Sequence, residues 1–507
     1  MLKKVSMSRN ILWSWATVVV NLFASFVLTP YIIRKLGLEG YGIWALVFSI
    51  TGYYTLLDLG FRSAAVRYTA HYRAKGEDHR LNVLVNTLLA YFTLIALLIF
   101  GLTLLLAPYV AGWFEISEQF APQIPLLVIL VGSTFGIGVA FNIFTGFVEG
   151  FQRFDLVNGI WLTAFGIRHP GCALLLYLGY GLVEMAALSL GTQLLMCTLY
   201  LIASKRMFPE LRFHWKLMEW ATLKETFSFG AFTFVSGVSG QSLEQTPQIL
   251  IGHLRSVAEV GFYTLPYRLL QYSADGVSRI GQILTPRTAE LAATGQKETI
   301  ARLVTLANRY SLLLYMPLTL FLLNWGSNTL YVWLKEKGPE VAEQSGALLP
   351  VMLVGFTYGL AGQFSSSSAL FGLNKHHKYA VGMAIEAVLS AGLMILTLPR
   401  YGIMAAAAVA STLILLRGLY ASFLFSRAVE IPWLSYLNGI WGGPTAIAIP
   451  VYAMGWWLQS VIPGRNWGEL IAAGVLTAGT YLPLGFIFCL DAEHRDKLLK
   501  VARLKTA

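Results

Sequence analysis

Long apolar segments recur along the whole of this sequence, and they decide what the chain can fold into. About fourteen runs of roughly 20 predominantly apolar residues follow one another, separated by short polar loops. A run of this length crosses the roughly 30 Å hydrocarbon core of a bilayer as an α-helix, which satisfies its backbone hydrogen bonds internally. The sequence therefore predicts an all-α polytopic membrane protein.

The composition agrees with this fold class. Of the 507 residues, 56% are hydrophobic and only 12% are charged, whereas a soluble domain carries roughly a quarter charged residues. The net charge of +11 raises the question of nucleic acid, but the basic residues are spread through short loops instead of forming one basic domain. We therefore expect the lipid bilayer, and no nucleic acid, as a partner.

The predicted spans form two groups of six and a last pair. They lie near residues 11–33, 41–66, 83–107, 123–149, 157–179 and 182–203, then 227–252, 260–286, 303–324, 346–372, 380–398 and 403–425, and finally 439–460 and 469–489. This grouping predicts an N-terminal six-helix lobe (1–204), a cytoplasmic linker (205–226), a C-terminal six-helix lobe (227–425) and a last helix pair with a basic tail (426–507).

The distribution of basic residues predicts the orientation. Most of the 37 Lys and Arg lie in the loops on the same side as the N-terminus, with the richest segments at 67–80, 205–224 and 495–505. Cytoplasmic loops carry such an excess in membrane proteins. An even number of spans then places both termini in the cytoplasm.

A weak internal repeat relates the two halves. The segment 37–44 leads into a span with Asp58 and Arg62, and the segment 256–263 leads into a span with Asp275 and Arg279. Both halves start from the cytoplasm, so the repeat is parallel, and a substrate path is expected between the halves. The alternative is that Gly-aromatic turns recur by chance.

Several charged residues fall inside predicted spans, where each costs about 2.5–3.5 kcal/mol unless it faces a wet or protein-lined interior. They are Asp58, Arg62, Arg168, Glu244, Arg268, Asp275, Arg279, Glu386 and Arg417. The pairs at positions 58/62 and 275/279 are spaced to neutralise each other locally on a helix, or to act in transport.

Arg168 and Arg268 have no acid four residues away, which makes them the strongest candidates for cavity cations. Arg168 precedes His169 and Pro170, where we expect a broken helix that frees backbone carbonyls. The alternative for Arg168 is a side chain that reaches to the membrane interface.

Arginines in a wet cavity favour an anionic ligand, because the guanidinium grips phosphate with two hydrogen bonds. The candidate substrate-binding cations are Arg62, Arg168, Arg268 and Arg279. Asp58, Glu244 and Asp275 are candidates for ion coupling. The sequence does not choose between H⁺, Na⁺ and membrane potential as the energy source.

Common catalytic motifs are missing from the sequence. It contains no GxxxxGKS or GxxxxGKT phosphate loop, no HExxH and no GxSxG. We therefore predict no catalytic residue, metal or cofactor, and expect an ion gradient or a partner to supply the energy.

The N-terminal residues resemble a known family. The segments LGLEGYGIWALVFSI (36–50) and LLDLGFRSAAVRYTA (56–70), with the Gly-acid turn at 76–78, are similar to bacterial polysaccharide flippases of the multidrug/oligosaccharidyl-lipid/polysaccharide (MOP) exporter superfamily. The similarity is strongest over about the first 80 residues. It implies two six-helix lobes in the V shape of multidrug and toxin extrusion (MATE) transporters, plus two C-terminal helices.

The resemblance also implies a function. Such a protein would flip an undecaprenyl-diphosphate-linked oligosaccharide from the cytoplasmic to the periplasmic leaflet of the inner membrane by alternating access, with polysaccharide polymerase and chain-length machinery as possible partners. Of the span-borne arginines, it points to Arg62 and Arg268. The competing interpretations are an ion-coupled multidrug antiporter of the same superfamily and a polytopic glycan ligase or transferase.

Overall fold

Helices make up every regular element in the part of the chain that the structure describes. The structure is a computed structural model that describes residues 7–335 and 338–496. The side chains of residues 7–19, 21–22, 63 and 227–236, and of several positions in 272–283, lie outside this description. The chain divides into two units, Met1–Gly261 and Phe262–Ala507.

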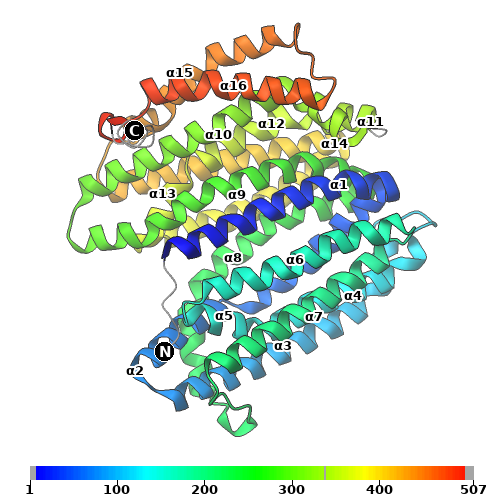
Figure 1. Ribbon diagram of the computed structural model, residues 1–507, viewed down its shortest axis with the longest axis vertical. Helices are drawn as coiled ribbons and strands as arrows, with labels where there is room; N and C mark the ends of the chain where they lie inside the picture. Colours follow the sequence, from blue (N-terminus) through cyan, green and yellow to red (C-terminus); the bar gives the residue numbers. More distant parts are fainter. Residues whose placement is uncertain (1–6, 336–337, 497–507) are drawn as a thin grey trace, which may run out of the picture. The chain divides into compact units, whose positions relative to one another are not determined.

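The first unit is a helical bundle (Figure 1). Its main helices are α1 (Met7–Gly52), α2 (Phe61–Lys75), α3 (Asp78–Trp113), α4 (Ile124–Ala140), α5 (Asn142–Gly150), α6 (Phe154–Tyr177), α7 (Leu182–Met207) and α8 (Trp220–Leu254). Helix α4 packs between α3 and α7, α6 packs on α1 and α7, and α2 lies against α5. Fully buried aromatic side chains such as Phe92, Phe144 and Phe147 fill the core between them.

The first unit has two breaks in its helices. The first lies in the predicted loop between the spans 11–33 and 41–66, and the second lies inside the predicted span 41–66. Helix α1 is interrupted at Gly37, whose φ of 74° and ψ of 177° are not helical. After α1, the short 3₁₀ helix η1 (Tyr53–Asp58) ends in Leu59 and Gly60, whose φ values of 48° and 79° are both left-handed. The left-handed region stops a right-handed helix, so the predicted span 41–66 is three helical segments instead of one.

The second unit is also a bundle. Helix α9 (Val257–Ala293) begins in the first unit and continues into the second, which contains α10 (Lys297–Leu334), α11 (Gly338–Gln344), α12 (Leu348–Val354), the π-helical segment η5 (Gly355–Ala361), α13 (Phe364–Gly372), α14 (His377–Ala428), α15 (Trp433–Leu458) and α16 (Trp467–Phe488). Helix α10 packs against α15 and α16, while α14 packs against α12, η5 and α13. Gly402 breaks α14 with a φ of 62° and separates the two predicted spans 380–398 and 403–425.

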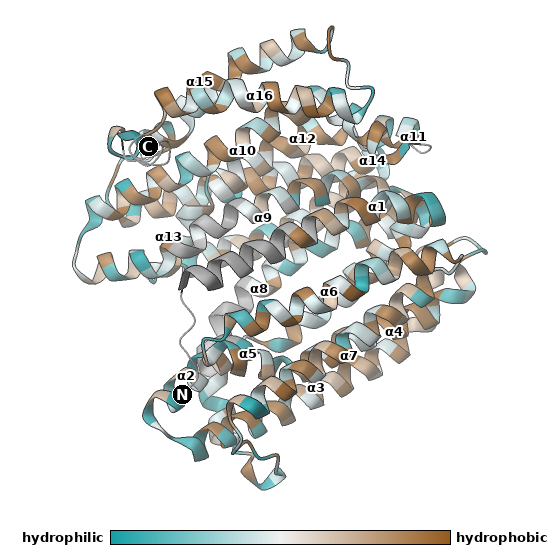
Figure 2. Cartoon of the chain, viewed as in Figure 1, coloured by the Kyte–Doolittle hydropathy of each residue, from teal (hydrophilic) through white to brown (hydrophobic). Residues whose placement is uncertain are grey.

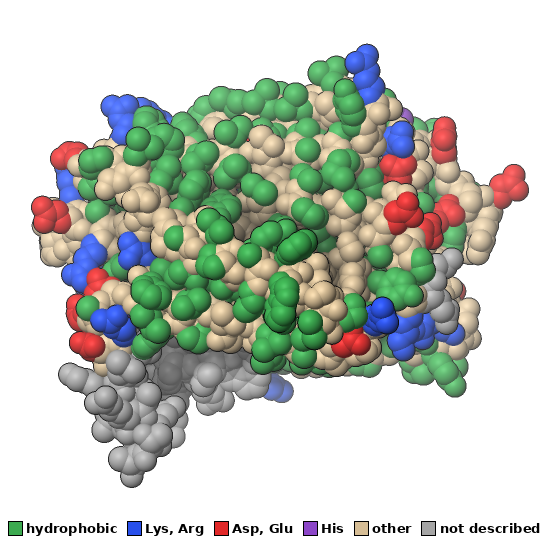
Figure 3. All heavy atoms as spheres, turned by 90° about the horizontal axis from the view of Figure 1, so that it is seen from above, with side chains coloured by type: hydrophobic (Ala, Val, Ile, Leu, Met, Phe, Trp, Pro, Cys, Tyr) green, Lys and Arg blue, Asp and Glu red, His purple; other side chains and the backbone are tan. Residues whose placement is uncertain are grey.

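The helices have the surface of a membrane protein. Seven helical stretches in the described part of the chain are long and apolar enough to cross a bilayer. Large apolar side chains such as Leu94, Leu97 and Leu105 on α3 are more than half exposed. Apolar residues predominate along α3, α4 and α7 (Figure 2). Figure 3 shows one face on which apolar side chains fill the middle and charged side chains gather toward both ends. An apolar belt between two charged rims is the surface that a bilayer requires.

These observations confirm the predicted all-α polytopic class. Apart from the break after Asp58, each predicted span lies largely within one helix or a consecutive series of helices. The total of fourteen crossings and the lobe boundaries at 204, 226 and 425 stay predictions.

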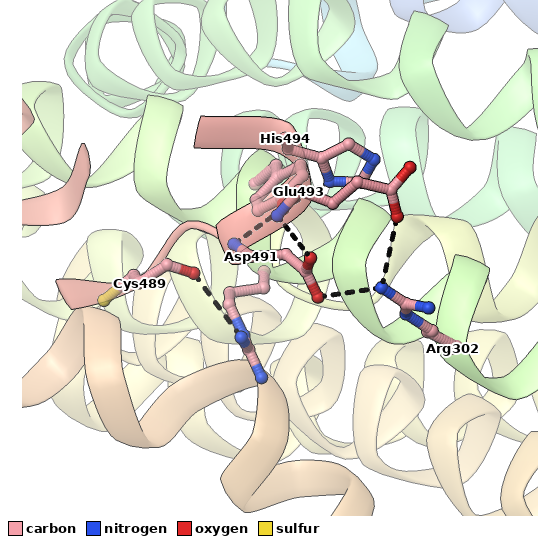
Figure 4. A network of polar contacts seen from close by, with 7 residues as sticks. Arg302, Cys489, Asp491, Glu493 and His494 are labelled. Atoms are coloured by element: carbon pink, nitrogen blue, oxygen red, sulfur yellow. Dashed lines mark hydrogen bonds and ion pairs between the residues drawn. The ribbon is translucent and has the colours of Figure 1, made fainter. Parts of the chain in front are cut away.

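The segment after α16 is attached to α10 (Figure 4). Arg302 lies 3.1 Å from Asp491 and 3.7 Å from Glu493, and the Tyr310 hydroxyl lies 2.8 Å from Nδ1 of His494. The Tyr310 hydroxyl also accepts a hydrogen bond from the backbone N–H of Asp491. These contacts hold the start of the C-terminal segment against the second unit.

Candidate functional site

A cavity of about 240 Å³ lies inside the helical bundle of the first unit. Arg62 and Arg168, which are 106 positions apart in sequence, both line it, so the structure brings together two of the four predicted cavity cations. The remaining lining residues are Phe48, Thr55, Thr134, Phe135, Gly138, Val139, Phe141, Asn142, Thr145, Trp161, Gln193, Met196, Cys197 and Tyr200.

Arg62 is held at the start of α2 by two carboxylates. Its backbone N–H donates to Oδ1 of Asp58 at 3.3 Å, and its guanidinium lies 2.7 Å from Oε1 of Glu149 on α5. The Arg62 side chain is 43% exposed and that of Glu149 is 16% exposed. The prediction that Asp58 and Arg62 share one helix is wrong, because the left-handed residues Leu59 and Gly60 separate them.

Close packing of α2 on α5 brings Glu149 within reach of Arg62. At Gly150 of α5, a Cβ atom would lie only 2.6 Å from Cβ of Thr69 on α2, and at Gly146 it would lie 3.2 Å from the Arg62 carbonyl oxygen. A larger residue at position 150 would force the helices apart. The absence of side chains at Gly146 and Gly150 therefore allows the close approach of α5 to α2 on which the ion pair between Glu149 and Arg62 depends.

Arg168 supplies a cation that is not balanced by an acid. Its guanidinium carbon lies 4.8 Å from the centre of the Phe165 ring, one turn earlier on α6, where the electron-rich ring face stabilises a cation. Among the described residues, no carboxylate lies within ion-pair distance of Arg168. The lining of the cavity contains Arg62 and Arg168 and no carboxyl group, while Asp58 and Glu149, which contact Arg62, are not part of the lining.

The helix around Arg168 is not broken as predicted. Helix α6 runs without interruption from Phe154 to Tyr177 and includes Pro170. The missing N–H of proline removes one backbone hydrogen bond, but the other bonds of this helix and its packing on α1 and α7 hold it together. Next to Arg168, Nδ1 of His169 lies 3.1 Å from the Phe165 carbonyl oxygen, so this imidazole bonds within its own helix.

The uncharged lining of the cavity combines hydrogen-bonding groups with aromatic rings. Asn142, Thr145 and Gln193 offer amide and hydroxyl groups, while Trp161 and Tyr200 offer ring faces. The volume is below the roughly 300–1,000 Å³ of pockets that enclose drug-sized ligands. In this conformation the cavity has room for one anionic group of a large ligand but not for the entire ligand.

The other predicted site residues lie elsewhere. Glu244 on α8 and Arg268 on α9 are half-buried and do not line this cavity. Asp275 and Arg279 are also on α9, but their side chains lie outside the described residues. Whether these four positions take part in binding or ion coupling stays a prediction.

Two ion pairs of the described residues were not predicted from the sequence, although Arg62, Glu386 and Arg417 were each named as charges inside spans. Glu149 falls at the predicted end of a span, where a carboxylate is inexpensive, so it gave no signal of its own. In the second unit, Arg417 lies 3.6 Å from Glu386, and the two side chains are 17% and 7% exposed. They occupy opposite sides of the break at Gly402, so only the reversal of the chain there brings them together.

Possible metal ligands do not converge in the described part of the chain, which contains no group of three or more His, Cys, Asp and Glu side chains placed to hold an ion. The recognisable chemistry of the described site is therefore that of cations, amides and aromatic rings around a small cavity.

The fold and the site define an all-α polytopic membrane protein with an arginine-lined cavity, and comparison with known proteins identifies its family. The family model for polysaccharide biosynthesis proteins matches residues 7–292, more than half of the chain. The chain belongs to this family, which confirms the resemblance stated from the N-terminal segments.

Two curated relatives match most of the chain. It is 24% identical over 510 aligned positions to the uncharacterized membrane protein EpsK of Bacillus subtilis (strain 168), with 95% of each chain covered. It is 20% identical over 429 positions to a putative O-antigen transporter of Shigella flexneri, with 84% of this chain and 99% of the relative covered.

Solved structures share the fold. A MATE family multidrug transporter of the MOP superfamily in an inward-facing conformation matches with a TM-score of 0.70 at 11% identity, and covers 82% of this chain and 99% of its own. The lipid II flippase MurJ in an inward closed conformation matches with a TM-score of 0.70 at 12% identity over 94% of this chain and 98% of its own. The chain therefore has the fold of the MOP superfamily.

Proposed function

We propose that this protein flips an undecaprenyl-diphosphate-linked oligosaccharide from the cytoplasmic to the periplasmic leaflet of the bacterial inner membrane, for cell-surface polysaccharide biosynthesis. The observation that carries the proposal is the cavity of the first unit, which Arg62 and Arg168 both line. The chain's membership of the family of polysaccharide biosynthesis proteins supports a glycan-linked substrate. Similarity to a relative named as a putative O-antigen transporter also supports the proposal.

The chemistry of the cavity suits a diphosphate. Arg168 has no carboxylate partner among the described residues, so a phosphate oxygen would meet an uncompensated guanidinium there. At Arg62, the same phosphate would compete with the Glu149 carboxylate for the guanidinium, and a diphosphate carries more negative charge than a carboxylate. Binding would thus exchange an internal ion pair for one with the substrate, and release would restore it.

Transport by alternating access follows from this exchange. A ligand moves a two-state equilibrium only when it binds one state better than the other. The exchange at Arg62 would provide such a difference, because binding would replace the contact with Glu149 that joins α2 to α5. Asp58, Glu244 and Asp275 remain the candidates for coupling this cycle to an ion, and Arg268 and Arg279 for further contacts with the substrate.

The remaining parts of the proposal concern topology and partners. Both termini lie in the cytoplasm, the lobes comprise residues 1–204 and 227–425, and the last helix pair with its tail comprises 426–507. The bilayer and the lipid-linked glycan are the partners of the cycle, and polymerase or chain-length proteins would receive the flipped product. Transport, and not a covalent reaction, is the proposed activity.

A deletion strain tests the proposal against the multidrug alternative. Loss of the gene is expected to abolish a surface polysaccharide and to accumulate its lipid-linked precursor on the cytoplasmic leaflet. Unchanged polysaccharide together with raised sensitivity to cationic drugs would overturn the flippase proposal and favour a multidrug antiporter.

A further inference from the structure

A second pocket, of about 640 Å³, lies in the second unit where α13 ends and α14 begins. Its lining residues are Leu370, Asn374, Lys375, His377, Lys378, Tyr420, Phe423, Leu424, Arg427 and Ala428. Three of them are cationic and none carries a carboxyl group. This pocket is separate from the arginine cavity, which belongs to the first unit.

The cations of the pocket come from the two ends of α14. After α13, Asn374 takes a left-handed φ of 54°, which turns the chain so that Lys375 precedes the first turn of α14. Nζ of Lys375 donates to the carbonyl oxygen of Ala428, at the other end of α14, at 3.4 Å. Arg427 lies in that same last turn, with its guanidinium carbon 5.8 Å from the centre of the Phe423 ring.

The opposite side of the pocket is apolar. The Tyr420 ring packs so tightly on the first half of α14 that a Cβ at Gly382 would lie 2.5 Å from it, and its hydroxyl donates to the Lys378 carbonyl oxygen at 3.2 Å. From the pocket along α14, Val381, Ile385 and Val388 form a stripe on one helix face, and each is more than half exposed. Positions three or four residues apart share a face, so the stripe leads away from the cations along the helix.

Positive charge is concentrated around this pocket. This charge comes from Lys375, Lys378 and Arg427. Burial and the neighbouring His377 lower the pKa of His376, which disfavours the charged form of this imidazole, and its ring stacks on Phe371 at 4.7 Å between centroids. The Glu430 carboxylate pairs with the Lys297 ammonium group and is also attracted by Lys375. Both ammonium groups, Lys297 more than Lys375, lower the pKa of the Glu430 carboxyl group, but Glu430 does not line the pocket, whose lining contains no acid.

We propose that this pocket binds the phosphate headgroup of an anionic phospholipid, with an acyl chain along Val381, Ile385 and Val388. A cationic mouth above an exposed apolar helix face has the chemistry of a membrane lipid, whereas a soluble anion would not use the apolar stripe. The predicted orientation places the mouth on the cytoplasmic side, where anionic lipids attract basic groups. The inference does not depend on the proposed transport function.

The test is titration of the full-length protein, purified in neutral detergent, with phosphatidylglycerol, counting bound lipid by native mass spectrometry. The K375A/K378A/R427A variant is expected to bind phosphatidylglycerol about tenfold or more weakly, and K378Q alone about fivefold more weakly, since each cation near an anionic lipid contributes to affinity. These side chains are exposed or partly exposed, so an unchanged unfolding temperature is expected in both variants.

A matched control is R206A/R212A/K216A, which removes three exposed cations from the predicted cytoplasmic side without touching the pocket. It is expected to bind phosphatidylglycerol within about twofold of the unaltered protein, because only general electrostatic attraction changes. Equal losses in both triple variants, or no loss in either, would overturn the site.

Undecaprenyl diphosphate shares the phosphate chemistry, so a parallel titration with it distinguishes the two sources. The phospholipid assignment expects the pocket variant to lose phosphatidylglycerol. If the variant loses only undecaprenyl diphosphate and keeps phosphatidylglycerol, the pocket is a substrate site and the phospholipid assignment is wrong. Neither outcome alters the test of transport in a deletion strain.

Discussion

The Arg62 guanidinium lies 2.7 Å from the Glu149 carboxylate and joins α2 to α5 across 87 positions of the sequence. Asp58, which is four residues away, holds the backbone N–H of Arg62 instead. The Arg62 side chain is thus oriented by a carboxylate that is distant in sequence, and in the proposed function a phosphate would replace that carboxylate. This relationship makes the roles of Arg62 in folding and in transport separable by experiment.

The double variant R62Q/E149Q separates the two roles. In R62Q alone, the mostly buried Glu149 carboxylate loses its partner, which is expected to cost about 1–3 kcal/mol of stability and to abolish surface glycan. In R62Q/E149Q that stability is expected to return without the glycan. Unfolding temperature in detergent and surface glycan are the two readouts, and normal glycan in R62Q/E149Q would contradict a substrate role for Arg62.

Arg168 is expected to affect transport with little effect on stability. It has no carboxylate partner among the described residues, so R168Q leaves no buried acid unpaired. We expect R168Q to lower surface glycan at least about tenfold at an unchanged protein level, and R168K to retain part of it, because lysine keeps the charge but loses the bidentate geometry. Quantifying glycan and protein together checks this, and full glycan in R168Q would argue against the cavity.

Much of the architecture follows from the sequence because apolar length alone determines where a chain crosses a bilayer. The span predicted at 157–179, for example, is α6 at Phe154–Tyr177. The break after Asp58 was not predicted, because Leu59 has no sequence signal for a left-handed conformation and Gly60 alone fits inside many membrane helices.

The site was predicted less completely than the helices. Arg62 and Arg168 were selected as cavity cations because charges in spans are costly. The sequence predicted a substrate path between the two halves, and it did not predict that these two arginines line one cavity within the first unit. Glu149 was missed because its contact with Arg62 depends on the packing of α5 on α2, which no local pattern encodes. The same holds for Glu386 and Arg417, which meet only after the chain reverses at Gly402.

Close helix packing in the second unit predicts a strong effect at one glycine and none at another on the same helix. A Cβ at Gly418 of α14 would lie 2.3 Å from the Gly359 carbonyl oxygen, whereas a Cβ at Gly392 would have nothing within 4 Å. Gly418→Ala is therefore expected to lower stability by about 1–3 kcal/mol, and Gly392→Ala to leave it unchanged or slightly raised. Thermal unfolding of both variants in detergent checks this, and equal midpoints would contradict the packing.

The turn between α5 and α6 predicts a pH effect. Hydrogen bonds from Arg153 at 2.8 and 2.9 Å hold the pKa of the Asp155 carboxyl below its ordinary value of 3.8. A carboxyl whose pKa is lower in the folded protein stabilises it above the unfolded pKa, and this contribution disappears as pH falls through the folded pKa.

The measurement is the unfolding temperature of the unaltered protein and of D155N between about pH 6 and about pH 3. At about pH 6 the unaltered protein is expected to unfold about 1–2 °C above D155N. This difference between the two proteins is expected to shrink as the pH falls toward the lowered pKa of Asp155. A difference that stays constant over this range would show that the Arg153 contact does not depend on the charge of Asp155.

Leaflet exchange in proteoliposomes tests most directly whether the arginine cavity of the first unit carries a lipid-linked oligosaccharide across the membrane. The protein is reconstituted into vesicles that contain undecaprenyl-diphosphate-linked oligosaccharide. A membrane potential, a proton gradient and a sodium gradient are then applied in turn. Under each, the time course of glycan exposure to an added lectin is measured. We expect the unaltered protein to expose glycan faster than empty vesicles under at least one gradient, and R168Q and R62Q/E149Q to match empty vesicles. Exchange at the unaltered rate in both variants would contradict the assignment of transport to this cavity.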